Sequence, residues 1–163
     1  MKKLNLACGQ DYMKGYKNVD VDKTVNADSY CDLSKLPFPF KDSEFDEIYC
    51  SNFLEHITIT VPEFLLECKR ILKREGKLTL VFPNSWWWRC RLSFIVGSFL
   101  WKSHYSPYHF NPLVKPSWVK IIGKSIGFDV QEGKKCGGVS GILFKNNLDL
   151  RESTVVLTLR KRG

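Results

Sequence analysis

The sequence has no long apolar run and no segment typical of a secretory leader. Its longest uncharged apolar stretch, Leu92–Trp101, is about half as long as a membrane-spanning helix needs to be. The amino-terminal MKKLNLACG has two lysines, but the six residues after them are too few for the apolar core of a signal peptide. We therefore expect a protein that neither crosses a membrane nor is exported.

Closely spaced cysteines are also missing. The 6 cysteines lie 18 to 46 residues apart and form no C-x-x-C pair, a spacing that suits neither a zinc site nor a disulfide framework. We expect free thiols in a reducing cytoplasm and no metal site. The strings G-x-G-x-x-G and G-x-x-x-x-G-K are absent, which disfavours dinucleotide oxidoreduction and nucleoside triphosphate hydrolysis.

Each half of the chain is short of charge of one sign. Residues 1–67 hold 7 Lys/Arg and 12 Asp/Glu, a balance of −5, whereas residues 68–163 hold 18 and 5, a balance of +13. This split fits a nucleic-acid face, an anionic substrate or the compensated surfaces of one fold. At 163 residues the chain is long enough for one domain and short for two, so we expect a single domain over 1–163.

Short apolar segments alternate with two stretches of helical periodicity. Only seven residues separate Gly9 from Lys17, too few for a full helix between two parallel strands. Strands that alternate with helices, followed by a closing strand pair, predict a three-layer α/β fold built on one sheet. The expected strands are 3–8, 18–22, 27–33, 44–50, 77–82, 128–132 and 154–160, and the expected helices are 61–73 and 118–125.

In an open α/β sheet the functional residues lie beyond the carboxyl ends of the strands. After the first strand comes the small-residue turn at Cys8–Gly9, which lets a ligand approach the backbone. After the second strand comes Asp20 or Asp22, an acid able to accept hydrogen bonds from both hydroxyls of a ribose. After the third comes Asp32–Leu33, where an acid followed by an apolar residue suits an adenine ring. This ordered set predicts a bound adenosine.

The same strings, in this order and spacing, resemble the small branch of the class I S-adenosylmethionine-dependent methyltransferases. The resemblance covers residues 3–84, about half of the chain, with a looser echo over 109–128. It implies a Rossmann-like methyltransferase sheet, mostly parallel with an antiparallel closing strand and a shortened first helix, and S-adenosylmethionine as the cofactor. The strings are LNLACGQ (4–10), NVDVD (18–22), DLSKLPFPF (32–40), FDEIYCSNFLEHI (45–57), ECKRILKREGKL (67–78) and FPN (82–84).

By resemblance, the turn after the first strand lies under the methionyl part of the cofactor. Asp20 would hold the ribose, with Asp22 as the alternative. The residues assigned to the cofactor are Ala7, Cys8, Gly9, Asp20, Val21, Asp32, Leu33 and Ser51. Two positions depart from the family pattern, because Ala7 replaces its first glycine and Asp11 its third. The amino-acid end of the cofactor site is therefore less well defined than the adenosine end.

Two histidines are candidates for a catalytic base. His109 follows the fifth strand among aromatic residues, and His56 ends the family-like LEH string. A base within hydrogen-bond reach would remove the proton of an alcohol acceptor. Each histidine also fits a packing role, His109 within an aromatic loop and His56 against the sheet.

An aromatic-rich segment over 85–116 differs from the rest of the chain. It holds all but one of the 5 tryptophans, together with Arg89 and Arg91. It has three interpretations: a substrate lid after the fifth strand, an interfacial patch for a membrane or a partner, or a plain packed helix. The pattern favours the lid, and peripheral membrane contact stays open.

The predicted function is transfer of a methyl group from S-adenosylmethionine to an oxygen or nitrogen of an acceptor. The alternative is a catalytically degenerate methyltransferase-like binding module for a protein or nucleic-acid partner, motivated by Ala7, the shortened first helix and a chain that begins directly at the first strand. Lipid, sugar, small-metabolite and nucleic-acid acceptors all stay open, as does the oligomeric state. The basic second half slightly favours an anionic acceptor, the aromatic segment suits an amphipathic one, and nucleic acid is not favoured.

Overall fold

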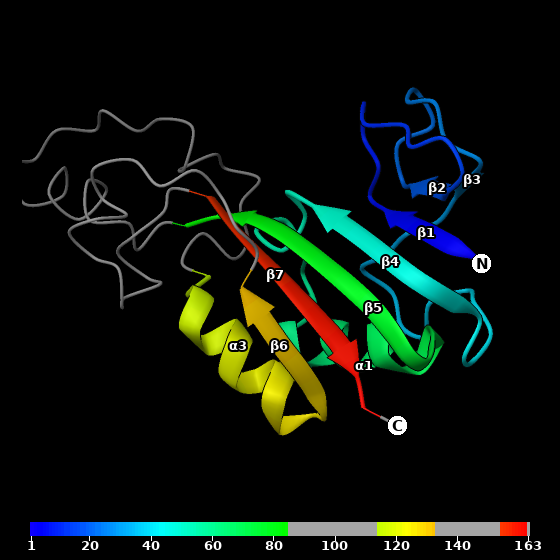
Figure 1. Ribbon diagram of the computed structural model, residues 1–163. Coiled ribbons are helices and arrows are strands. Elements are labelled where there is room, and N and C mark those ends of the chain that lie inside the picture. Colours follow the sequence, from blue (N-terminus) through cyan, green and yellow to red (C-terminus); the bar gives the residue numbers. More distant parts are fainter. Residues whose placement is uncertain (85–113, 133–153, 163) are drawn as a thin grey trace, which may run out of the picture.

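The described part of the chain forms one seven-stranded sheet and two helices. The computed structural model describes residues 1–84, 114–132 and 154–162 (Figure 1). The strands are β1 (Lys3–Leu6), β2 (Lys17–Asp20), β3 (Ser29–Tyr30), β4 (Phe45–Ser51), β5 (Leu72–Pro83), β6 (Phe128–Glu132) and β7 (Thr154–Lys161), and the helices are α1 (Val61–Ile71) and α3 (Pro116–Ser125).

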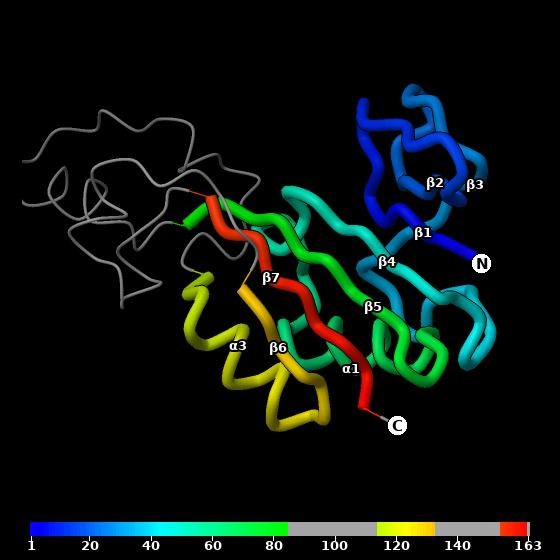
Figure 2. Tube along the Cα trace, in the orientation of Figure 1, coloured from blue at the N-terminus to red at the C-terminus, as the bar shows by residue number. Residues whose placement is uncertain are grey.

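The strands lie in the order β3-β2-β1-β4-β5-β7-β6. Every pairing from β3 to β5 is parallel, whereas β7 runs antiparallel to both of its neighbours, β5 and β6. Figure 2 shows β7, the last strand along the chain, lying between β5 and β6. The expected α/β sheet, mostly parallel with an antiparallel closing strand, is confirmed.

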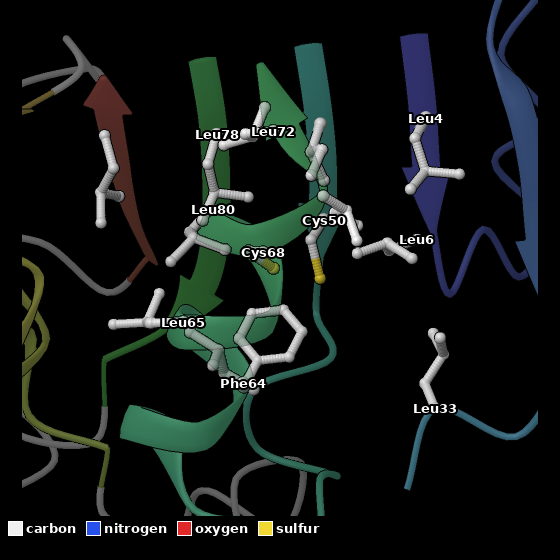
Figure 3. Close-up of a cluster of buried hydrophobic side chains, with 14 of the residues drawn as sticks. Leu4, Leu6, Leu33, Cys50, Phe64, Leu65, Cys68, Leu72, Leu78 and Leu80 are labelled. Carbon is white, nitrogen blue, oxygen red and sulfur yellow. The ribbon is translucent and has the colours of Figure 1, made fainter. Parts of the chain in front are cut away.

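The core lies between the sheet and the helices. Along β7 the buried Val155, Leu157 and Leu159 alternate with half-buried residues, which is the period-2 pattern of a strand with one face covered. Figure 3 shows side chains of α1, Phe64 among them, gathered against apolar side chains of the strands. Gly123 lets α3 approach β7 closely, because a Cβ there would lie 2.8 Å from Leu159 Cδ2.

Helix α1 begins at a capping box and ends earlier than its periodicity predicts. The Thr60 side chain accepts a hydrogen bond from the Glu63 N–H, and the Glu63 carboxylate accepts one from the Thr60 N–H at 2.8 Å. At the other end, Leu72 is extended, fully buried and paired with Phe45 of β4. The predicted helix end at Lys73 is wrong, because strand pairing replaces helical hydrogen bonding from Leu72 onward.

Arg70 of α1 holds the segment that connects β3 to β4. Its guanidinium donates to the carbonyl oxygens of Phe38 (3.0 Å) and Phe40 (2.9 Å) and pairs with Glu67 (2.8 Å) and Asp42 (2.7 Å). These contacts raise the pKa of Arg70 and lower that of Glu67. Both phenylalanine side chains are buried, so the segment enters the core although it has little secondary structure.

Among the residues that the structure describes, no helix is long and apolar enough to cross a membrane. Most of the aromatic-rich segment, residues 85–113, lies outside the described residues. Its three interpretations therefore stay predictions.

Candidate functional site

Four parallel strands end at the same edge of the sheet. Leu6 of β1 pairs with Val19 of β2 on one side and with Cys50 of β4 on the other, and Asp20 of β2 pairs with Tyr30 of β3. The loops that follow these four strands therefore meet at one edge. Ligands of open α/β sheets bind at such an edge, and the predicted cofactor residues all lie on or just after these strand ends.

The turn after β1 has a backbone shape that small residues adopt most easily. Ala7 and Gly9 have φ angles of 53° and 51°, in the left-handed region. The Cys8 N–H donates to the Val19 carbonyl oxygen at 3.0 Å, and the Asp11 N–H donates to the Cys8 carbonyl oxygen at 2.8 Å. The chain therefore reverses tightly beside β2, and Ala7 adopts a conformation that usually favours glycine.

Asp20 closes this turn from the end of β2. Its Oδ2 accepts from the Gly9 N–H at 2.8 Å, and its Oδ1 accepts from the Asp22 N–H at 3.0 Å. A carboxylate has about four acceptor positions, so these two bonds leave about two more. Beside the turn there is open space, because a Cβ built on Gly9 would meet no atom within 4 Å.

An exposed apolar residue lies between Asp20, which ends β2, and Asp22, which follows it. Val21 has 63% of its surface exposed, whereas Asp20 has only 8%. Asp22 is exposed, and its Oδ1 accepts from the N–H and the hydroxyl of Thr24 at 2.8 and 2.7 Å. These bonds lower the pKa of Asp22. The edge thus presents one buried carboxylate, one exposed carboxylate and an accessible apolar side chain.

Asp32 and Leu33, which follow β3, lie in different environments. The Asp32 carboxylate is part-exposed, accepts from the N–H and hydroxyl of Ser34 at 3.0 and 2.5 Å, and lies 3.3 Å from the Lys35 ammonium. These contacts lower its pKa. Leu33 is 3% exposed and belongs to the core cluster, as Figure 3 shows. Leu33 therefore anchors the segment, and Asp32 offers the accessible polar group.

The three buried cysteines that the structure describes are poor nucleophiles. Burial raises the pKa of Cys8, Cys50 and Cys68, which disfavours the reactive thiolate. All three are free and buried, and they act as small apolar fillers. Ser51, the last residue of β4, is half-buried next to Cys50.

Of the two predicted histidines, the structure describes only His56. It follows the carboxyl end of β4, its side chain is 38% exposed, and its Nε2 lies 3.9 Å from Oε1 of the buried Glu55. His109 lies outside the described residues. Within the part of the chain that the structure describes, no group of three or more His, Cys, Asp or Glu side chains is arranged to hold a metal ion.

Comparisons with known proteins agree with this fold. Residues 6–80 match the model of a family described as a methyltransferase domain. YcgJ of Bacillus subtilis superposes with a TM-score of 0.68 at 15% identity, covering 99% of this chain and 92% of that one. A SAM-dependent methyltransferase from Archaeoglobus fulgidus superposes with a TM-score of 0.69 at 16% identity, covering 98% and 86%. This is the fold of the class I methyltransferases. The resemblance that the motifs indicate is thereby confirmed.

One curated relative matches this chain over a stretch shorter than residues 6–80. The uncharacterised protein MJ0638 of Methanocaldococcus jannaschii is 47% identical over 49 residues, which are 30% of this chain and 21% of that protein. The match thus spans about a fifth of that relative's length.

The methyltransferase fold also contains a partly buried polar cluster whose contacts the sequence motifs do not indicate. We call Asn5, Asn18 and Asp28 the asparagine cluster. Asn5 of β1 is 2% exposed and Asn18 of β2 is fully buried, and Asn5 Nδ2 donates to Asn18 Oδ1 at 2.9 Å. The backbone N–H and Nδ2 of Asn18 both donate to Asp28 Oδ2, at 2.7 and 3.1 Å. In the sequence, Asn5 and Asn18 stand within the strings LNLACGQ and NVDVD, at strand positions where an apolar residue is usual.

Proposed function

We propose that this chain binds S-adenosylmethionine at the edge formed by Ala7–Gly9 and Asp20 and transfers its methyl group to an oxygen or nitrogen of an acceptor. One observation carries the proposal: the Gly9 N–H donates to the Asp20 carboxylate at 2.8 Å. This contact joins the turn after β1 to the acid after β2, and both lie within the residues that match the methyltransferase domain.

The residues at this edge fit the cofactor. Open space beside Gly9 would take the methionyl part, because no side chain competes for it. Asp20 keeps acceptor positions for the ribose hydroxyls while it holds the Gly9 and Asp22 N–H groups. Val21 supplies exposed apolar surface for the adenine ring, and Asp32 supplies an acceptor for its amino group.

The reaction requires no covalent bond between the protein and the transferred methyl group. When bound, S-adenosylmethionine supplies a sulfonium methyl group that is already electrophilic. The tasks left to the chain are to align the two reactants, to exclude water and to accept one proton. No protein nucleophile is needed, and the raised pKa of Cys8 keeps the thiol beside the turn neutral.

Among the described residues, His56 is our candidate for the proton acceptor, and His109 remains the second candidate. The His56 imidazole is part-exposed, so an acceptor can reach it from solvent. The Nε2 atom that would take up the proton lies 3.9 Å from Oε1 of the Glu55 side chain. A base of this kind assists an oxygen acceptor, whose proton must leave as the new bond forms.

The test of this function is ligand binding followed by turnover. Titration calorimetry with S-adenosylmethionine or S-adenosylhomocysteine should show one site. Ligand at about 100 times its Kd should stabilise the chain by about 2.7 kcal/mol, which corresponds to a rise in Tm of roughly 5–10 °C. Mass spectrometry should detect S-adenosylhomocysteine formation with an added acceptor. The absence of binding in calorimetry together with an unchanged Tm would overturn the proposal. Binding without S-adenosylhomocysteine formation would favour the binding-module alternative.

A pair of glycine variants tests the placement of the methionyl part. Gly9 and Gly15 both have positive φ, at 51° and 85°, and a Cβ at either would meet no atom within 4 Å. Gly9→Ala and Gly15→Ala therefore introduce similar backbone strain. Only the first adds a methyl group at the residue whose N–H donates to Asp20. We expect Gly9→Ala to weaken S-adenosylhomocysteine binding about tenfold, or ~1.4 kcal/mol, and Gly15→Ala to change it less than about twofold. Equal losses in calorimetry would contradict this placement.

A further inference from the structure

The segment between β1 and β2 has to be held in place without a helix. Parallel strands are usually joined by a crossover that contains one, and this helix orients the turn that precedes it. In residues 7–16, all of which the structure describes, the chain forms only turns and irregular backbone. The polar backbone groups of this segment therefore need other partners.

Asn18 supplies partners for the second part of this segment. Its Oδ1 accepts from the Met13 N–H at 2.8 Å, and its Nδ2 donates to the carbonyl oxygens of Met13 at 3.1 Å and Tyr16 at 3.0 Å. A side-chain amide can donate two hydrogen bonds through its nitrogen while its oxygen accepts others. Because the Asn18 side chain is fully buried, water has little access to its end of these part-buried bonds.

The other members of the asparagine cluster hold the first part of the segment and brace Asn18. Asn5 Nδ2 donates to the Asp11 carbonyl oxygen at 2.9 Å, and the Asp11 N–H in turn donates to Cys8. Asp28 accepts two bonds from Asn18 through Oδ2 and one from the Tyr12 hydroxyl through Oδ1 at 2.9 Å. The bonds from Asn18 lower the pKa of Asp28, which keeps it an ionised acceptor.

We propose that the asparagine cluster positions the turn at Ala7–Gly9 so that the Gly9 N–H meets Asp20. In this role it replaces the helix that usually follows the first strand and that residues 7–16 do not form. Asn18 and Asp20 are two residues apart on β2, so they project to the same side of the strand. Asn18 and the proposed cofactor-binding carboxylate of Asp20 thus contact the same loop from one strand. Asn18 is a positioning residue, and this role deepens the proposed function and rests on it.

The substitution Asn18→Asp tests the role because it keeps the shape of the side chain and removes its donor. The new carboxylate would face Asp28 and two carbonyl oxygens with no proton to offer. We expect S-adenosylhomocysteine affinity to fall at least about tenfold. We also expect amide hydrogen exchange at Gly9, measured without ligand, to accelerate several-fold while exchange at Leu80 in the central strand β5 changes little.

Three further variants separate positioning from general destabilisation. Asn26→Asp makes the same chemical change at an exposed neighbouring site and should alter neither affinity nor exchange at Gly9. Asp28→Ala removes the brace at an exposed residue and should fold even where Asn18→Asp does not, with a several-fold loss of affinity and faster exchange at Gly9. In the double variant Asn18→Asp with Asp28→Asn, the donor and the acceptor change places, and part of the lost affinity should return.

Two results would separate this inference from the proposed function. Failure of the unchanged chain to bind either ligand would overturn the proposed function. If the unchanged chain binds, but Asn18→Asp and Asp28→Ala bind equally well and leave exchange at Gly9 unaltered, the positioning role is wrong while the proposed function stands. Exchange that accelerates equally at Gly9 and Leu80 would also overturn the role, because it would reveal global destabilisation only.

Discussion

Replacing Asp20 with alanine is expected to weaken binding of S-adenosylhomocysteine by about a hundredfold or more. The change removes the proposed ribose acceptor, and it also leaves the N–H groups of Gly9 and Asp22 without the carboxylate that now accepts from them. Each ribose hydroxyl that loses its acceptor in the complex costs on the order of 1–3 kcal/mol of binding free energy, so two such losses reach a hundredfold. Titration calorimetry measures the affinity, and circular dichroism confirms that the variant folds.

Asp22→Ala is the matched control, because it removes the same group two residues further along. Asp22 is exposed and accepts from Thr24 rather than from the turn after β1. We expect its affinity to stay within about threefold of the unchanged chain, since an exposed hydrogen bond contributes little. If Asp22→Ala abolished binding and Asp20→Ala did not, the ribose would belong to Asp22, and Asp20 would serve only to shape the turn.

Phe64→Ala is expected to cause the largest loss of stability, about 3–5 kcal/mol. Phe64 is completely buried on the inner face of α1, and its ring centroid lies 6.2 Å from that of Phe38 and 6.0 Å from that of Phe53. Truncation would leave a cavity between the helix and the connecting segments, because neighbours on a rigid sheet relax only in part. The free energy of unfolding in urea measures the effect.

The same helix offers a control for this loss. Leu66 lies two residues further along α1 with 50% of its surface exposed, so Leu66→Ala removes an apolar side chain without opening a cavity. Its expected cost is within about 0.5 kcal/mol. A loss at Phe64→Ala as small as that at Leu66→Ala would mean that burial of the Phe64 ring contributes little to the stability of α1.

Local patterns in the sequence predict the strands well and the junctions between elements less well. Leu78 and Leu80 alternate with half-buried residues, and this pattern needs no knowledge of distant parts of the chain. Leu72 behaves differently. It continues the helical periodicity of α1, yet its partner is Phe45 in a strand that precedes the helix. A pairing between segments far apart leaves no trace in helical spacing, which explains why the predicted helix is too long.

The candidate site shows the same division. Gly9 and Asp20 could be predicted because a small-residue turn and an acid at successive strand ends form a recognisable order, although their 2.8 Å contact could not. Asn18 could not be predicted, since its role depends on backbone carbonyl oxygens that only the folded loop brings within reach. Leu33 is 3% exposed, so burial in the core accounts for its apolar side chain, and its predicted place beside the adenine ring stays a prediction.

The position of β7 has a consequence for how the chain is made. Roughly 70 residues separate the end of β5 from the start of β7, yet these two strands are neighbours in the sheet. At a synthesis rate of about 5–20 residues per second, β5 waits about 4–14 s for its partner. During that interval one side of β5 is an unpaired edge on which another nascent chain can add a strand. Aggregation during synthesis should therefore depend on how fast residues 84–153 are translated, even when the stability of the finished protein is unchanged.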